Sequence, residues 1–397
     1  MTALDSKRRI SFGDLGREPF RIFFPAGVLA GIVGVSLWPL YFTGRLEFYP
    51  GLGHARIMAY GLFGGFIFGF LGTAMPRMLG AKPLRVIEVL PLVLGHGAMV
   101  ASFAATKLFL GDVLFLVLLG AFVGCMSIRA TQRKDTPPPG FVLVGLAFLS
   151  VAAGGVLAIV EHYRDLDAFW VLLQRLLSSQ GFVLLPILGI GPFILPRFFG
   201  MQSQHDFPEA LVPAAGWLKK ALIAFGAGVI IIASFFLEAA GWHRIAYGLR
   251  FVTTLVYLLL ELPLHRAPKA TNALGACIRI AFLGVLAGFF AVSLFPAYRV
   301  SLLHLTLIGG FAVITFVVAT RVAFGHSGNL ALLKARNAWL LIAVGLMLFG
   351  MATRISGDFW LKILPSHYTY GSLIWIAGIT LWAGYVLPKV LIADTED

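Results

Sequence analysis

Hydrophobic and polar positions alternate along the chain on a long scale, with apolar runs of about 20 residues separated by short polar segments. A run of this length is what an α-helix needs to cross a hydrocarbon core of roughly 30 Å. Because backbone groups in lipid must be satisfied within their own segment, the runs predict helices. Twelve spans are predicted, over residues 20–43, 56–76, 86–106, 111–128, 141–160, 174–196, 217–238, 245–263, 274–294, 301–323, 337–353 and 368–388. We therefore expect an all-α, polytopic membrane bundle.

The composition agrees with this class and adds a simple domain organisation. The 397 residues are 59% hydrophobic and 12% charged, with a mean hydropathy of +0.90, which excludes an ordinary soluble domain. We expect a basic cytoplasmic tail at 1–19, a single membrane domain at 20–390 and a cytoplasmic tail at 391–397. The basic start reaches no small-residue cleavage site, so we interpret it as a tail and not as a removed signal peptide. Cys125 and Cys277 lie in apolar runs without CxxC spacing, which favours a packing role.

The distribution of basic residues predicts the orientation. Twenty of the 31 Lys and Arg residues lie in the first tail and the even-numbered loops, and seven lie in the odd-numbered loops. The positive-inside rule then places both termini in the cytoplasm. The net charge of +13 is therefore interpreted as orientation and contact with anionic lipid, with the bilayer as partner and no nucleic acid.

Three span ends share a short motif, which indicates a possible internal repeat. The motifs are Met75-Pro76-Arg77 with Gly80, Leu195-Pro196-Arg197 with Gly200, and Thr320-Arg321 with Gly325. The three arginines are 120 and 124 residues apart, about one four-span unit each. Arginine is also common at cytoplasmic helix ends. Two interpretations stay open: three four-helix pseudo-repeats, or plain membrane anchoring by Arg77, Arg197 and Arg321.

Two histidines are candidates for holding a cofactor. His54 begins the second span and His304 lies just inside the tenth, so the predicted topology puts both in the outer half of the membrane. Histidines on facing helices can hold a haem between them. Gly61 and Gly65 repeat at four-residue spacing, and such a bare helix face admits another helix or a flat cofactor. His96, in the middle of the third span, is either a ligand or a hydrogen-bonded core residue, and we favour the second.

The sixth span is unusual because it contains Pro186, Pro192 and Pro196. Proline removes a backbone donor and disturbs the preceding helical turn. Two interpretations are open: a hinge or cavity wall, or a plain kink filled by neighbouring helices. The intramembrane carboxylates lie near span ends, which argues against proton-coupled transport. No Walker loop, GxSxG, CxxCH or HExxH pattern occurs.

Motifs in chain order resemble the NnrS family. The stretch from His54 to Pro76 is similar to its signature helix, the Pro/Gly-rich stretch 186–197 to its middle motif, and the segment from His304 to Gly328 to its late motif. The resemblance implies a haem- and copper-containing bacterial inner-membrane protein linked to nitric oxide metabolism, denitrification and resistance to nitrosative stress. The matching positions are His54, His304, Arg321 and His326.

One departure from the family pattern concerns copper. The family usually reads His-Ala-His-Glu-Met at the first motif, and here Arg56 and Ile57 replace the second histidine and the glutamate. Arginine does not serve as an ordinary metal ligand, so copper is in doubt. The twelve spans in three units are reminiscent of the haem–copper oxidase core, by analogy of fold alone. The copper histidines of that core have no counterpart here: Gln174, Gln180 and Trp217 are the nearest residues.

The main hypothesis is an NnrS-like haem protein, with a b-type haem iron held by His54 and His304. Met58, Gly61 and Gly65 are expected cofactor contacts, and His326 is a further candidate metal ligand. The expected partners are nitric oxide or a related small molecule, which arrives through lipid, and an unidentified electron donor. The alternatives are a metal-free transporter or anion-conducting protein, gated by the broken sixth span with Arg175 as anion contact, or a scaffold without chemistry.

Overall fold

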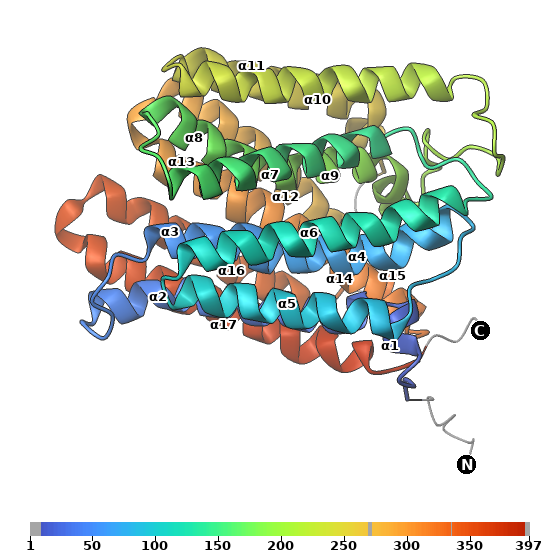
Figure 1. The fold of residues 1–397 in the computed structure, drawn as a ribbon, viewed down its shortest axis with the longest axis horizontal. Helices are drawn as coiled ribbons and strands as arrows, with labels where there is room; N and C mark the ends of the chain where they lie inside the picture. The colour runs from blue at the N-terminus through green and yellow to red at the C-terminus, as the bar shows by residue number, and fades with distance from the viewer. Residues whose placement is uncertain (1–8, 269–271, 335, 394–397) are drawn as a thin grey trace.

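The computed structural model describes residues 9–268, 272–334 and 336–393, and within them the chain is a bundle of long helices (Figure 1). The outermost residues of both predicted tails, 1–8 and 394–397, lie outside the described part. The described chain begins and ends at the same end of the bundle, where Arg9 and Ile392 form an isolated β-bridge.

Eleven segments of the described chain are long and apolar enough to cross a membrane. This confirms the prediction of a polytopic all-α bundle. Their helices are α2 (Phe20–Phe42), α3, η1 and α4 (Gly51–Arg56, Ile57–Phe63, Gly64–Met78), α5 (Val86–Ala104), α6 (Leu108–Thr131), α7 (Phe141–Glu161), α8, η2 and α9 (Ala168–Leu176, Leu177–Gly181, Phe182–Ile194) with η3 (Leu195–Phe199), α10 (Trp217–Ala239), α12 (Ala273–Leu294), η5, α13, η6 and α14 (Pro296–Tyr298, Arg299–His304, Leu305–Ala312, Val313–Gly325), α16 (Ala338–Phe359), and η7 and α17 (Leu361–Ile363, Leu364–Val390). Shorter helices are α1 (Asp14–Arg17), η4 (Leu264–Arg266) and α15 (Leu330–Lys334).

The remaining predicted span, 245–263, corresponds to α11 (His243–Glu261), which is less apolar than the other eleven. It packs along α10 at one edge of the bundle (Figure 1). Its polar side chains are used internally: Arg250 is fully buried and its guanidinium lies 2.9 Å from the carboxylate of Glu238 on α10. The lower hydropathy of α11 therefore reflects a buried ion pair between neighbouring helices.

The second, sixth and tenth spans share one construction. Each begins as a short α-helix, widens into a π-helical segment and continues as an α-helix. The π-helical segments η1, η2 and η6 begin at Ile57, Leu177 and Leu305, which are 120 and 128 residues apart. This spacing is close to that of the arginine motif and supports the interpretation as an internal repeat. A π-helical segment carries an extra residue and is often found at functional sites.

The three π-containing spans meet in the middle of the bundle. The segments η1 and η6 both contact α9, and α4 contacts α14. The last long helix, α17, packs along both α16 and the first long helix, α2. The starts of η1 and η6 lie at one end of this group of spans. The two candidate histidines, His54 and His304, lie just before these starts.

Candidate functional site

His54 is fixed by a backbone carbonyl of the neighbouring helix. It lies in α3, three residues before η1, and its Nδ1 is 2.9 Å from the carbonyl oxygen of Gly34 on α2. A carbonyl can only accept, so Nδ1 carries the hydrogen and Nε2 keeps its lone pair. The ring of Trp38 lies edge-on to the imidazole, with 5.8 Å between the ring centroids.

His304 also bonds a backbone carbonyl through Nδ1, but within its own helix. It is the last residue of α13, directly before η6, and its Nδ1 donates to the carbonyl oxygen of Val300 at 2.8 Å. Its Nε2 therefore also keeps a lone pair. Histidines that bind metals usually donate their other ring N–H to a carbonyl or carboxylate in this way, which fixes the tautomer and the ring. The donor chemistry of both histidines thus fits iron ligation.

Arg354 on α16 is a charged group close to both histidines. Arg354 is held by Asp358, at 2.8 Å, and its guanidinium lies 3.6 Å from the ring centroid of Tyr368. Arg354 was not predicted as a site residue, because it follows the predicted span 337–353 and there reads as a loop charge. The available signal was the i, i+4 spacing of Arg354 and Asp358 in an otherwise apolar helix.

The glycine face of the second span is occupied by helices. A Cβ added to Gly61 would lie 2.9 Å from the Cβ of Ala30, and one added to Gly65 would lie 3.0 Å from the Cα of Gly27, both on α2. The sulfur of Met58, in η1, lies close to Gly34, which is also on α2. The bare backbone therefore allows close helix packing, while cofactor contact by Met58, Gly61 and Gly65 stays a prediction.

His96 belongs to this packing and is a hydrogen-bonded core residue. It is buried on α5, and its Nε2 donates to the carbonyl oxygen of Gly61 at 2.8 Å. The absent side chain at Gly65 leaves space for the same imidazole, whose Nε2 would lie 3.2 Å from an added Cβ. This agrees with the role favoured from the sequence.

Arg56 faces away from the histidine pair. Its Nε donates to Asp112 on α6 at 2.8 Å, and the other oxygen of this fully buried carboxylate is 3.5 Å from Nε2 of His162. His54 and Arg56 are two residues apart on one helix, so their side chains leave it in different directions. Arg56, the departure from the motif that the sequence resembles, is therefore one partner of a buried ion pair.

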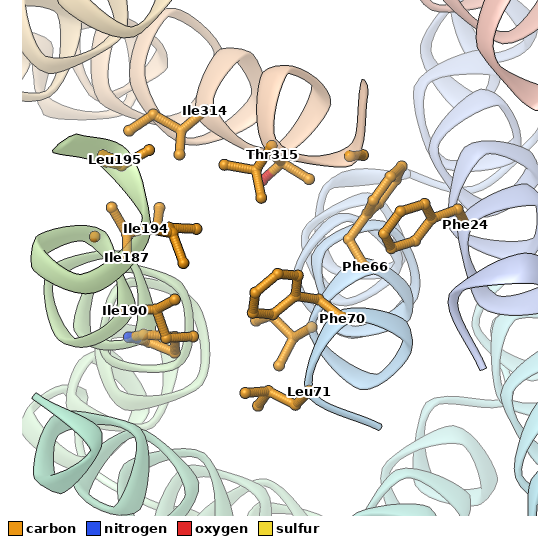
Figure 2. A pocket seen from close by; sticks show the side chains of 15 residues that line it. Phe24, Phe66, Phe70, Leu71, Ile187, Ile190, Ile194, Leu195, Ile314 and Thr315 are labelled. Atoms are coloured by element: carbon orange, nitrogen blue, oxygen red, sulfur yellow. The ribbon is translucent and has the colours of Figure 1, made fainter. Parts of the chain in front are cut away.

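The sixth span forms one wall of an apolar cavity of about 90 Å³. Figure 2 shows Ile187, Ile190 and Ile194 of α9 facing Phe66 and Phe70 of α4. Pro186 and Pro192 lie inside α9, which nevertheless continues as a helix. Of the two interpretations from the sequence, the cavity wall describes this span.

The motif arginines and His326 lie far from the histidine pair. His304 and His326 flank η6 and α14, a separation of about 30 Å at 1.5 Å per residue. Arg77 pairs with Glu18 at 2.7 Å, and Arg197 with Asp206 at 2.9 Å. The guanidinium of Arg321 lies 5.0 Å from the ring centroid of Phe198. The motif arginines therefore make separate local contacts.

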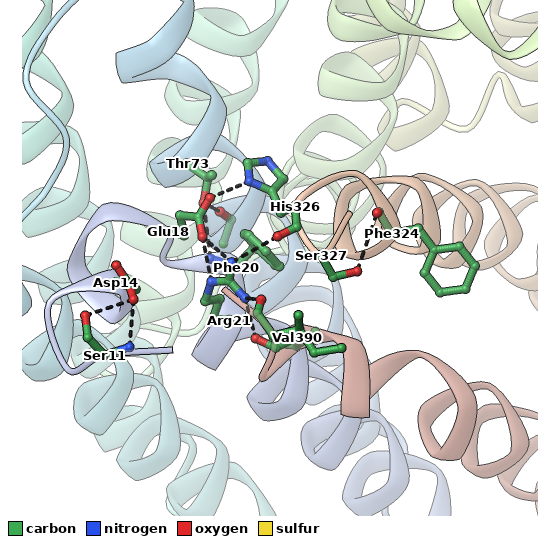
Figure 3. A network of polar contacts seen from close by, with 12 residues as sticks. Ser11, Asp14, Glu18, Phe20, Arg21, Thr73, Phe324, His326, Ser327 and Val390 are labelled. Carbon is green, nitrogen blue, oxygen red and sulfur yellow. Dashed lines mark hydrogen bonds and ion pairs between the residues drawn. The ribbon is translucent and has the colours of Figure 1, made fainter. Parts of the chain in front are cut away.

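His326 contributes to a polar cluster that joins several helix ends (Figure 3). Its Nδ1 contacts the carboxylate of Glu18, which also accepts from Arg21 and Arg77. Arg21 in turn donates to the carbonyl oxygens of Val390 and Ile392, at 2.5 and 2.7 Å. Among the described residues, no group of three or more His, Cys, Asp or Glu side chains could hold a metal. Metal binding by His326 stays a prediction.

Comparison with known protein families places this chain in one of them. A family model described as "NnrS protein" matches residues 14–393, nearly the whole described chain. No curated protein matches the sequence.

Proposed function

Because the chain belongs to the NnrS family, we propose that it is a haem-binding membrane protein whose iron is held by His54 and His304 and which acts in the response to nitric oxide or in its removal. Membership makes it a membrane protein linked to nitric oxide in general. A bound haem supplies an iron that exchanges electrons and coordinates diatomic ligands. The histidine pair supplies the residue-level part of the proposal.

The observation that carries the proposal is the matched state of two imidazoles at the starts of two π-helical segments. Both donate from Nδ1 to a backbone carbonyl, which leaves both Nε2 atoms able to bind iron. Each lies within three residues of a π-helical segment on a pseudo-equivalent span. A structural histidine has no need of this repeated arrangement, whereas a ligand pair requires fixed rings with a lone pair each.

Arg354 is the basic residue that acts on this site. Haem carries two carboxylates. The guanidinium of Arg354, which Asp358 already holds in place, is suited to form an ion pair with them. Arg77, Arg197 and Arg321 lie at the opposite end of the spans, so we assign them no contact with the haem. They retain the anchoring role considered from the sequence.

Copper does not fit the residues at the first motif. The Arg56 guanidinium has no lone pair for a metal, and it already neutralises Asp112. We therefore include haem and no copper in the proposal for this position. The proposal also includes a bacterial inner membrane with both termini in the cytoplasm, as the family and the bias of basic residues indicate.

Visible spectroscopy tests the histidine pair. The purified protein from haem-replete cells should show a Soret band, and iron held by both imidazoles would give a low-spin spectrum. His54→Ala and His304→Ala should each lose the band, or become high-spin and bind carbon monoxide when reduced. His367→Ala is the matched control, because this outer-end histidine is bonded to Ser356. A native protein without a Soret band contradicts the proposal, as does a low-spin spectrum that survives in both alanine variants.

The metal-free alternative gains no specific support in the described residues. Arg175, the expected anion contact, is exposed on α8. The wall that α9 contributes to the cavity is apolar, which does not suit an anion.

A further inference from the structure

The apolar cavity between α4, α9 and α14 is a feature that the proposed haem site does not use. Fifteen residues line it, and of these Thr315 alone has a polar side chain. Figure 2 shows Phe66 and Phe70 on one side, Ile187 and Ile190 on another, and Thr315 on the third. All three π-containing spans thus contribute to one apolar cavity, which is only partly enclosed.

The walls of this cavity select against water and ions. A buried water needs two to four polar partners, which these side chains do not provide. Apolar cavities of comparable size stay dry and take up small apolar molecules such as xenon. The volume of about 90 Å³ admits a molecule of this size and excludes a porphyrin. Shape and chemistry therefore favour a small, uncharged, apolar occupant.

The cavity lies on the same spans as the histidine pair, but deeper. Thr315 follows His304 by 11 residues and Phe66 follows His54 by 12, which places the cavity about 15–18 Å further along the helices. Between the two levels the buried rings of Phe63 and Phe311 meet edge to face, with 6.3 Å between their centroids. An aromatic pair thus separates the cavity from the histidines.

We propose that this cavity is a docking site for a small uncharged gas molecule. Apolar gases partition into lipid, and the half-buried side chains of Phe70, Ile187 and Val318 border the cavity on three different spans. The identification of the gas as nitric oxide rests on the proposed function. The preference for an apolar, uncharged molecule rests on the cavity wall alone.

Xenon-pressurised crystals of the whole protein test the proposal. The expected result is an anomalous peak between Phe66, Ile190 and Thr315. Ala319→Leu should abolish the peak, because Ala319 lines the cavity and the larger side chain fills it. Thr315→Val should keep the peak, since it preserves volume and removes the hydroxyl. The matched control is Ala98→Leu, the same substitution at an exposed position of α5.

Val318→Leu is a second variant in case Ala319→Leu misfolds. It enlarges a side chain of the cavity wall by less, so it should weaken the xenon peak. A native crystal without xenon between these residues overturns the proposal, as does continuous acyl-chain density in the cavity. The visible spectrum of the same crystals separates the two hypotheses. Xenon binding without a Soret band contradicts only the haem proposal, whereas a Soret band without xenon contradicts only the docking site.

Discussion

At the scale of single residues, the difference between His54 and Arg56 explains how this chain departs from its family motif. The two side chains are neighbours in sequence, but His54 bonds to α2 and Arg56 to α6. Asp112 is fully buried, so an unpaired carboxylate there would be costly. The arginine compensates this charge without a metal. The loss of the second histidine therefore leaves the His54 side of the helix unchanged.

The ion pair between Arg56 and Asp112 leads to a stability prediction. Asp112→Asn should lower the free energy of unfolding by about 3–5 kcal/mol, because Arg56 would stay buried without its partner. The double variant Arg56→Met with Asp112→Leu should recover most of this loss, since no buried charge remains. Denaturant unfolding in detergent measures both. A double variant less stable than Asp112→Asn would contradict the explanation.

At the scale of elements, both candidate histidines lie within three residues of a π-helical segment, His54 before η1 and His304 before η6. The sequence predicted the long helices and the repeated arginines, because apolar length and spacing are local properties. The π-helical segments have no comparable local signal, since Ile57–Phe63 reads as an ordinary apolar helix. Their position depends on packing against other spans. For the same reason, the sequence could pair His54 with His304 only as a hypothesis, and it missed the role of Arg354.

Removal of one residue from a π-helical segment tests its importance. Deletion of Ile308 in η6 should restore α-helical winding and change the direction of His304 relative to α14, so the Soret band should be lost. Deletion of Ser179 in η2 is the matched control, because that span carries neither histidine. Absorbance per folded protein, with folding checked by size-exclusion chromatography, measures the effect. A deletion of Ile308 that keeps the band would show that this segment does not orient the ligand.

At the scale of the whole molecule, the polar cluster around Glu18 joins several helix ends at one end of the bundle. Glu18 contacts Arg21, Arg77 and His326, which lie at the ends of three different spans. Arg21 adds the end of α17 through the carbonyl oxygens of Val390 and Ile392. Apart from the i, i+3 pair of Glu18 and Arg21, these contacts join residues far apart in the sequence, so the hydropathy pattern could not predict them. His326 was predicted from the sequence as a candidate metal ligand, and in the structure its Nδ1 contacts the carboxylate of Glu18.

Glu18 should therefore contribute more to stability than its single charge suggests. Glu18→Gln leaves the buried Arg21 without a carboxylate and should lower the free energy of unfolding by about 3–5 kcal/mol. Asp206→Asn is the control: its pair with Arg197 is exposed and should contribute at most about 1 kcal/mol. Thermal unfolding in detergent compares the two. Equal shifts in the unfolding temperature would argue against a special role of the cluster.

The contact between Arg21 and Val390 also has a consequence for biosynthesis. The two residues are 369 positions apart, and at 5–20 residues per second a ribosome needs roughly 20–70 seconds between them. During this interval α2 is already made, but the carbonyl oxygens that Arg21 bonds and the α17 surface that α2 packs against do not yet exist. The first long helix is therefore in the membrane before its partner α17 is made. In this interval the incomplete chain is exposed to quality-control proteases.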